Sequence, residues 1–430
     1  MVLSDRMYRL CAFLAYLAVV STVAAAKVRH VDSDPRGILL LTQVIIDEGT
    51  VKLDSIPDVR REYGYVIHRK DGHYYYNFPL GTSVVAIPFV AIARAFGADM
   101  LRHERATQLI IVAIVSLLIF KFLVDLARLY LNRNLALLAA LAGWFGTSLA
   151  STGATALWSH DFAVLFALVA ILTALRSTAA SPSPQAKGGP LLIGVCLFLA
   201  FCCRPTFALL VPCLLAFLFI RGPRLPLRVC AVLGAALCVF VFFSYREFGQ
   251  PLPDYYRPQR LSNDAFTTAL AGNLFSPGRG LLVFSPIFLL PLLLLRSTTR
   301  ALMQDRRVAL IALLWPILHL GVVSRFPHWW GGYTFGPRLL MDALPGLFLL
   351  LCLTMKQACH DAPRTARTAL YIAGAVSIFI NTYQGLFNTY TAKWNAQPSI
   401  DKHPELVFDW RYPQFLHGEA RHRQRMTDYR

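Results

Sequence analysis

The sequence predicts an all-α membrane protein, a polytopic helical bundle of about 11 transmembrane spans with a large first outer loop. Its 430 residues are 56% hydrophobic and only 15% charged, and the mean hydropathy is +0.49. A soluble domain of this size carries far more charge. Apolar stretches close to the ~20 residues that a membrane crossing needs recur along the chain. Together these observations indicate an integral membrane protein.

The net charge of +18 sets the predicted orientation. The basic residues gather in short connections between apolar stretches, which is typical of cytoplasmic loops facing anionic lipid and not of a nucleic-acid-binding surface. The first span, residues 8–26, therefore runs from the cytoplasm outward. Its flanks, with Arg6 and Arg9 before the apolar run and Ala24 to Ala26 after it, also fit a cleaved signal peptide.

The first outer loop is expected over residues 27–105, with interfacial helices. Residues 79–97 are apolar enough to span, but Pro79, Pro88 and Arg94 interrupt them. A crossing there would move every later basic cluster outside. We therefore predict a helix that lies at, or re-enters, the outer interface.

The later spans alternate from there and leave the polar tail outside. We divide the chain into a transmembrane domain, residues 1–387, and an outer-face tail, residues 388–430. The predicted spans after the first loop are 106–127, 135–150, 161–176, 191–203, 206–220, 229–245, 281–295, 308–324, 339–355 and 368–387.

Several common chemistries have no support in the sequence. All nine cysteines lie in or beside apolar segments and none forms a Cys-x-x-Cys pair, which speaks against a disulfide framework and structural zinc. The sequence also lacks the phosphate-binding loop, the dinucleotide fingerprint, the zinc-protease motif and the serine-hydrolase elbow.

Two aspartates directly after the first span are the leading candidates for chemistry. Asp32 and Asp34 lie in Val31-Asp32-Ser33-Asp34-Pro35, where a carboxylate at the outer mouth of the bundle can act as a general base. They are also compatible with surface acids or a helix start. The Asp-x-Asp spacing suits a metal-bridging pair but is a weak signal, so a divalent metal there is possible and not required.

The other candidates collect on the same predicted outer face. Asp161 begins a span and is either a second acid or a helix cap. Arg338 begins a span at its outer end, against both the positive-inside rule and the helix dipole, and a bound phosphate would resolve that conflict. Carboxylates, arginines and aromatic rings together suit sugar-phosphate chemistry. The remaining predicted substrate- or phosphate-binding residues are Arg279, Arg204, His160, Tyr76, His328, Trp330 and Tyr333, although the aromatic ones also fit an interfacial belt.

The order of these features resembles the GT-C glycosyltransferases, integral membrane enzymes that include the protein O-mannosyltransferases and the aminoarabinose transferases. The resemblance rests on the acidic motif after the first span, on Asn77-Phe78-Pro79-Leu80-Gly81, on Asp161, and on the segments 273–281 and 330–338. These two segments, and the tail, look like those of uncharacterised bacterial members. The resemblance implies a polyprenyl-phosphate sugar donor, inverting displacement at the outer face, and a first-loop aspartate as base or acceptor-orienting residue. That role falls on Asp32 or Asp34, with Asp34 favoured.

The sequence thus predicts a glycosyltransferase that needs no cofactor. Its partners would be a lipid-linked sugar, membrane lipids and a glycan, lipid or protein acceptor, with no nucleic acid. The resemblance implies a bacterial cytoplasmic membrane, although the charge pattern alone would equally suit the endoplasmic reticulum. We expect the N-terminus inside and the C-terminus outside. A lipid or sugar transporter, which needs ionisable residues deep in its spans, and a non-catalytic scaffold of envelope assembly are the alternatives.

Overall fold

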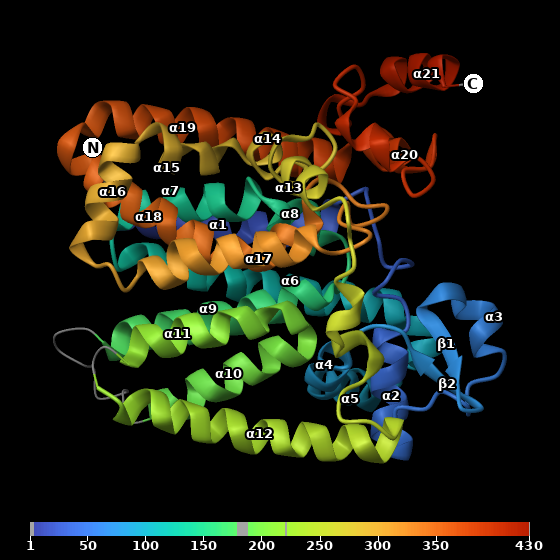
Figure 1. Ribbon diagram of the computed structural model, residues 1–430. Coiled ribbons are helices and arrows are strands. Elements are labelled where there is room, and N and C mark those ends of the chain that lie inside the picture. The colour runs from blue at the N-terminus through green and yellow to red at the C-terminus, as the bar shows by residue number, and fades with distance from the viewer. Residues whose placement is uncertain (1–3, 179–187, 220–221, 430) are drawn as a thin grey trace.

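A computed structural model describes residues 4–178, 188–219 and 222–429 of the chain. Within them the protein is a bundle of apolar helices, with smaller elements gathered at one end (Figure 1). The N-terminal end of the described chain lies at the opposite end of the bundle (Figure 1). The expected all-α polytopic class is confirmed.

Six helical segments are long and apolar enough to cross a membrane among the described residues. They are α1 (Asp5–Ala25), α6 (Met100–Arg128), α9 (Ser159–Ser177), α12 (Arg224–Phe248), the segment Arg338–Asp361 that ends in α18 (Leu344–Asp361), and the segment Pro363–Phe387 that begins with α19 (Pro363–Ile378).

Two bent pairs raise the number of candidate spans to eight. α7 (Arg133–Phe145) is followed at 46° by Ser148–Thr155, which contains α8 (Ser148–Ser151). The segment Pro286–Leu293, with α15 (Leu290–Leu293), meets α16 (Leu295–Gln304) at 77°.

Three further apolar helices correspond to predicted spans but are shorter: α10 (Gly189–Cys203), Pro205–Phe219 with α11 (Leu210–Phe219), and Leu310–Ser324 with α17 (Trp315–Ser324). A straight crossing needs about 20 residues. In place of the eleven crossings predicted, the described chain therefore has six to eight full-length candidates and three shorter helices.

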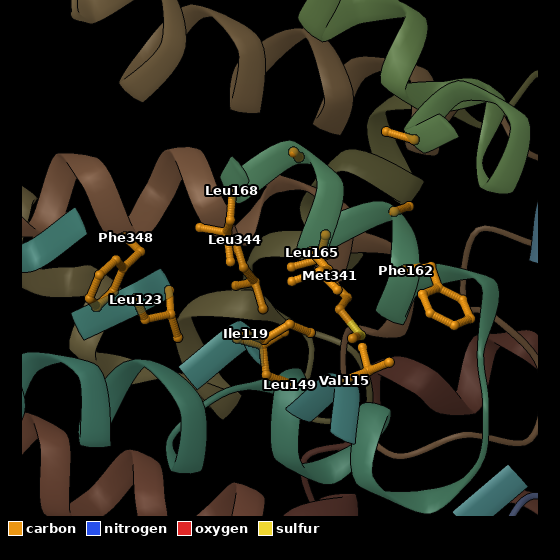
Figure 2. Packing of buried hydrophobic residues seen from close by; sticks show 14 of the residues in the cluster. Val115, Ile119, Leu123, Leu149, Phe162, Leu165, Leu168, Met341, Leu344 and Phe348 are labelled. Carbon is orange, nitrogen blue, oxygen red and sulfur yellow. The ribbon is translucent and has the colours of Figure 1, made fainter. Parts of the chain in front are cut away.

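The interior of the bundle consists of closely packed aliphatic and aromatic side chains. Figure 2 shows Val115, Ile119 and Leu123 of α6 facing Phe162, Leu165 and Leu168 of α9, with Leu149, Met341, Leu344 and Phe348 filling the space around them. All of these side chains are buried. This packing fixes α6, α9 and α18 relative to one another, and the polar ends of these helices carry the residues discussed below.

The first outer loop folds into short elements at the end of the bundle (Figure 1). They are α2 (Ile38–Glu48), α3 (Val59–Tyr63), α4 (Gly81–Val85) and α5 (Ile87–Ala95), with an antiparallel hairpin of β1 (Ile67–Lys70) and β2 (His73–Tyr76). The hairpin was not predicted; the three consecutive tyrosines of β2, Tyr74 to Tyr76, are residues that favour strands. Residues 81–95 form two short helices, neither of them a candidate span.

Gly81 allows α4 to lie against the end of α10. A Cβ at this position would stand 2.2 Å from the carbonyl carbon of Cys202, closer than any side chain allows. This close approach brings the first outer loop next to Arg204, the residue that follows α10.

The tail is folded and packed, although the sequence suggests only a polar extension. It contains α20 (Tyr390–Ala396) and α21 (Glu419–Asp428). Two short helices from earlier in the chain, α13 (Phe266–Phe275) and α14 (Leu281–Phe284), come before α15. Trp394, Ile400 and Val407 of the tail bury against Trp329 and Trp330. The tail thus lies at the same end as the first outer loop (Figure 1).

Candidate active site

The loop that joins α1 to α2 is held by polar side chains of α6. The buried carboxylate of Glu104 accepts hydrogen bonds from the backbone N–H groups of Gly37 (2.9 Å) and Leu39 (3.0 Å), and so satisfies the free donors at the start of α2. Gln108 donates to the carbonyl of Pro35 at 3.0 Å. Gly37 has φ +89, a conformation that favours glycine. These contacts fix the position of the loop that carries Asp32 and Asp34.

Asp34 lies between two donors that come from distant parts of the chain. Its Oδ1 accepts from the hydroxyl of Tyr65 at 2.8 Å, and its Oδ2 accepts from Nη1 of Arg338 at 2.8 Å. Tyr76 donates to the backbone carbonyl of Asp34. Burial alone would raise the pKa of the Asp34 carboxyl, but the charge of Arg338, the two hydrogen bonds and the charge of Arg204 outweigh it and lower the pKa. Asp34 is therefore ionised at neutral pH.

Asp32 has a different environment. Its Oδ1 accepts from Nε (3.0 Å) and Nη2 (2.7 Å) of Arg105 on α6, and both side chains are largely exposed, at 48% and 72%. An exposed ion pair of this kind contributes little to stability. The structure thus separates the two aspartates: Asp34 faces Arg338, and Asp32 faces solvent and Arg105.

A cavity of about 1050 Å³ opens beside Asp34. Its wall brings together segments from the first outer loop, from α9, from the region after α10, from the loop before Arg338 and from the tail. Eight of the eleven residues predicted from the sequence line it: Asp32, Asp34, Tyr76, His160, Arg204, His328, Tyr333 and Arg338.

Arginines and aromatic rings alternate around this cavity. The guanidinium of Arg338 lies 4.5 Å from the ring centre of Trp158, and that of Arg260 lies 4.0 Å from the ring centre of Tyr255. Such cation–π contacts orient a guanidinium without occupying all its N–H groups. The Nε of Arg338 is buried and has no hydrogen-bond partner among the described residues. The two guanidiniums are therefore already oriented at the cavity wall, where an anion would meet them.

A fully buried carboxylate, Asp342, stands behind the cavity wall. Its Oδ1 lies 2.6 Å from Nδ1 of His160, and its Oδ2 accepts from Nε of Arg204 (3.1 Å) and from the hydroxyl of Thr206 (2.9 Å). Asp342 was not predicted from the sequence. The available signal was a second charge, four residues after Arg338, inside an apolar segment.

Further cavity residues were also missed. Tyr65, His30 and Arg260 line the cavity, and only their place in the folded loops reveals this. Burial lowers the pKa of His30 to about 4, with Arg338 acting in the same direction and Asp34 opposing it. His30 is therefore a neutral imidazole beside Trp158, with its ring centre 6.0 Å from that of the indole.

Arg279 is not available to a phosphate, contrary to expectation. Its side chain is buried, and its guanidinium donates to the carbonyls of Gly278 (2.7 Å), Trp330 (2.5 Å) and Gly332 (2.8 Å) and to the side chains of Asn395 (2.7 Å) and Gln414 (2.8 Å). Protein oxygens thus occupy all its donors. Arg279 ties the tail to the 330–332 loop.

Asp161 and Trp330 also have structural partners. Asp161 accepts from the backbone N–H of Trp158 at 2.9 Å, which is the helix-cap alternative raised from the sequence. Trp330 is buried against Trp329 and Trp394 and donates to Asp401 at 2.8 Å. Among the described residues, those that line the cavity include neither of these two nor Arg279.

The described residues contain no group of three His, Cys, Asp or Glu side chains placed to hold a metal ion. The carboxylates of Asp32 and Asp34 are turned toward Arg105 and Arg338 respectively. Metal binding by this pair would require at least one of these ion pairs to open.

Comparison with known proteins yields one similar structure. No family model matches the chain, and no curated protein does. Among solved structures, the chain is similar to the oligosaccharyltransferase of Archaeoglobus fulgidus, solved with zinc and sulfate, at 15% identity and a TM-score of 0.48. The similarity covers 80% of this chain and 50% of the other, so the chain spans about half the length of that protein. At this level of similarity, the function has to rest on the residues of the cavity.

Proposed function

We propose that the chain is a membrane glycosyltransferase that transfers a sugar from a polyprenyl-phosphate donor to an acceptor hydroxyl at the outer face. The observation that carries the proposal is the placement of Asp34, ionised and held by Tyr65 and Arg338, in the wall of a cavity lined with arginines and aromatic rings. This transfer needs at least a general base and, next to it, groups that donate hydrogen bonds to the departing phosphate.

Asp34 would act as the base. Its carboxylate accepts the proton of the acceptor hydroxyl as the hydroxyl oxygen attacks the anomeric carbon of the sugar. The bond from that carbon to the phosphate oxygen breaks, the phosphate leaves with the electron pair, and the proton stays on Asp34. Because attack and departure take place on opposite faces of the carbon, the anomeric configuration inverts.

Arg338 and Arg204 would hold the phosphate. Both line the cavity, and each uses one nitrogen on a carboxylate, Asp34 or Asp342. Arg204 also donates from Nη1 to the hydroxyl of Tyr255 at 3.4 Å. The terminal N–H groups that these contacts do not use would bind phosphate oxygens, for which the guanidinium geometry is well suited. Two fixed cations supply the charge stabilisation, so the proposed reaction requires no metal, although a divalent ion at Asp32 and Asp34 is an alternative.

Aromatic groups would bind the sugar and the start of the lipid. Tyr333 is 42% exposed and its hydroxyl lies 2.6 Å from that of Ser399 in the tail, while His328 packs on Trp330 with ring centres 4.8 Å apart. Both line the cavity with Phe78 and Trp158. Aromatic faces suit the C–H faces of a sugar ring and an isoprenoid chain alike.

The test is turnover by purified protein in lipid with a panel of radiolabelled polyprenyl-phosphate sugars. We expect release or transfer of sugar from at least one donor, and competitive inhibition by the sugar-free polyprenyl phosphate. The variant Arg338→Gln should weaken binding of both lipids. Arg325→Gln is the matched control, because Arg325 contacts Phe266 and does not line the cavity. Failure to bind or turn over any donor would favour a transporter or a scaffold.

A further inference from the structure

The contacts of Asp342 fix the chemistry of two cavity residues at once. The carboxylate is fully buried and is hydrogen-bonded to His160, Arg204 and Thr206. His160 is only 2% exposed, yet it lines the cavity, as do Arg204 and Thr206. Among the described residues, every side chain that is hydrogen-bonded to Asp342 is therefore a part of the cavity wall.

The charges of this network balance when His160 is neutral, with a proton on only one of its two ring nitrogens. Arg204 supplies the positive charge that compensates Asp342, and Arg338 is a second cation facing the same histidine. A neutral imidazole carries one proton, and a carboxylate can only accept. The proton therefore belongs on Nδ1, which lies 2.6 Å from Asp342. The lone pair is then on Nε2, the ring nitrogen that does not contact Asp342, in a residue that lines the cavity.

We propose that Asp342 is a positioning residue for two cavity side chains. It orients His160 so that Nε2 can accept a hydrogen bond from a substrate hydroxyl, and it orients Arg204 so that the guanidinium can donate hydrogen bonds to a phosphate. This inference rests on the function proposed above. A lone pair repels phosphate oxygens and accepts from O–H groups, so His160 and Arg204 face different parts of one substrate. Because the transferred sugar is joined directly to the phosphate, the hydroxyl bound by His160 belongs to that sugar.

A network with only a structural role predicts a different result in binding measurements. Asp342 could satisfy its lone pairs with any three donors and would not need to determine which nitrogen of His160 faces the cavity. The proposal instead predicts discrimination: His160 should matter for a lipid phosphate that carries a sugar and not for the same lipid without it. Arg204 should matter for both.

Binding measurements with the wild type and the variant His160→Asn test this difference. Asparagine keeps an N–H near the position of Nδ1, and so preserves the contact with Asp342, but presents nothing at the position of Nε2. We expect affinity for a short-chain polyprenyl-phosphate hexose to fall about 3- to 10-fold, as loss of one hydrogen bond requires, and affinity for the bare polyprenyl phosphate to stay unchanged. His360→Asn is the control, since His360 is exposed at the far end of α18.

Equal loss of affinity for both lipids, or no loss for either, would overturn the inference while leaving the proposed function standing. If the wild type binds neither lipid, the proposed function fails, and the assignment to a sugar hydroxyl fails with it. The binding data therefore distinguish the two failures.

Nitrogen-15 spectra of histidine-labelled protein test the tautomer without any substrate. The His160 signals are identified by their absence in His160→Asn. We expect a protonated Nδ1 and an unprotonated Nε2 in the wild type, and a shift of the proton to Nε2 in Asp342→Asn, whose amide can donate to Nδ1. The control Asp361→Asn, which lies in the same helix and pairs with Arg300, should leave the signals in place. A protonated Nε2 in the wild type would overturn the inference even if Asp342→Asn does not fold.

Discussion

At the scale of single residues, the pairing of Asp34 with Arg338 decides the protonation state of the proposed base. Burial favours the neutral acid, and Arg338 contributes most to reversing that effect. A carboxyl with a lowered pKa stays ionised until the pH falls below its usual range. Activity that needs the ionised form should therefore persist into acidic pH and decline only as the pH falls through the lowered pKa.

The variant Arg338→Gln should shift the acidic limb of the pH–rate profile, the range where activity declines as the pH falls, to higher pH. Without the guanidinium, burial dominates, the pKa of Asp34 rises, and the acidic limb of the pH–rate profile shifts to higher pH. The measurement is the pH dependence of kcat/KM for both proteins. Arg105→Gln, which removes only the partner of the exposed Asp32, should leave the limb in place. An unchanged limb in Arg338→Gln would contradict the role of this pair.

The sequence predicted single residues well where a charge stood against its surroundings. Arg338 was identified because a cation at the outer end of a span has a cost, and the structure places it beside Asp34 in the cavity wall. Arg279 looked similar in sequence, between two glycines, yet it is surrounded by backbone and amide oxygens. Partners supplied by the tail, 116 and 135 residues away in sequence, cannot be read from local composition.

At the scale of elements, the tail is a part of the cavity wall and is attached through Arg279. Ala392 and Asp401 of the tail line the cavity, and Tyr333 reaches Ser399. The first outer loop forms the facing part of the wall. The packing of the tail depends on partners far away in sequence, such as Arg279 with Asn395 and Gln414, which explains why it was not predicted.

Replacing Arg279 should loosen the tail. Arg279→Met removes five hydrogen bonds and takes from the buried carbonyls of Gly278 and Trp330 the donor that Arg279 supplies, at a cost of about 3 kcal/mol or more. We expect faster hydrogen exchange and proteolysis over residues 388–429, with little change in the transmembrane helices. Arg411→Met is the control, because Arg411 is an exposed residue of the same tail. Unchanged protection of the tail in Arg279→Met would refute this role.

At the scale of the whole molecule, hydropathy predicted the helices and their order closely, because each membrane segment is decided locally by its apolar length. It did not predict which of them are bent or short. Pro205 and Pro286 begin two of these segments, whereas the two bends lie at residues 146–147 and at Leu294, where there is no proline. The geometry of the bends depends on the neighbouring helices. The cavity lies at the end of the bundle that the basic-residue distribution assigns to the outside.

Cysteine labelling in oriented vesicles tests that orientation. Glu62→Cys lies in the first outer loop and Arg306→Cys in the basic connection after α16, and both positions are exposed. A membrane-impermeant maleimide added on the outer side should label position 62 and not 306, in a background without the exposed Cys230 and Cys238. The reverse pattern would place the cavity in the cytoplasm and contradict the proposed use of the outer face.

The most direct test of the central claim compares two neighbouring aspartates in one assay. Single-turnover sugar transfer from a polyprenyl-phosphate donor is measured for the wild type, Asp34→Asn and Asp32→Asn, with donor binding measured in parallel. The structure predicts that Asp34→Asn retains donor binding and loses about 10²-fold or more in rate, as expected for a general base, while Asp32→Asn stays within a few-fold of the wild type. Full activity of Asp34→Asn, or loss of activity confined to Asp32→Asn, would contradict the assignment of Asp34 as the base.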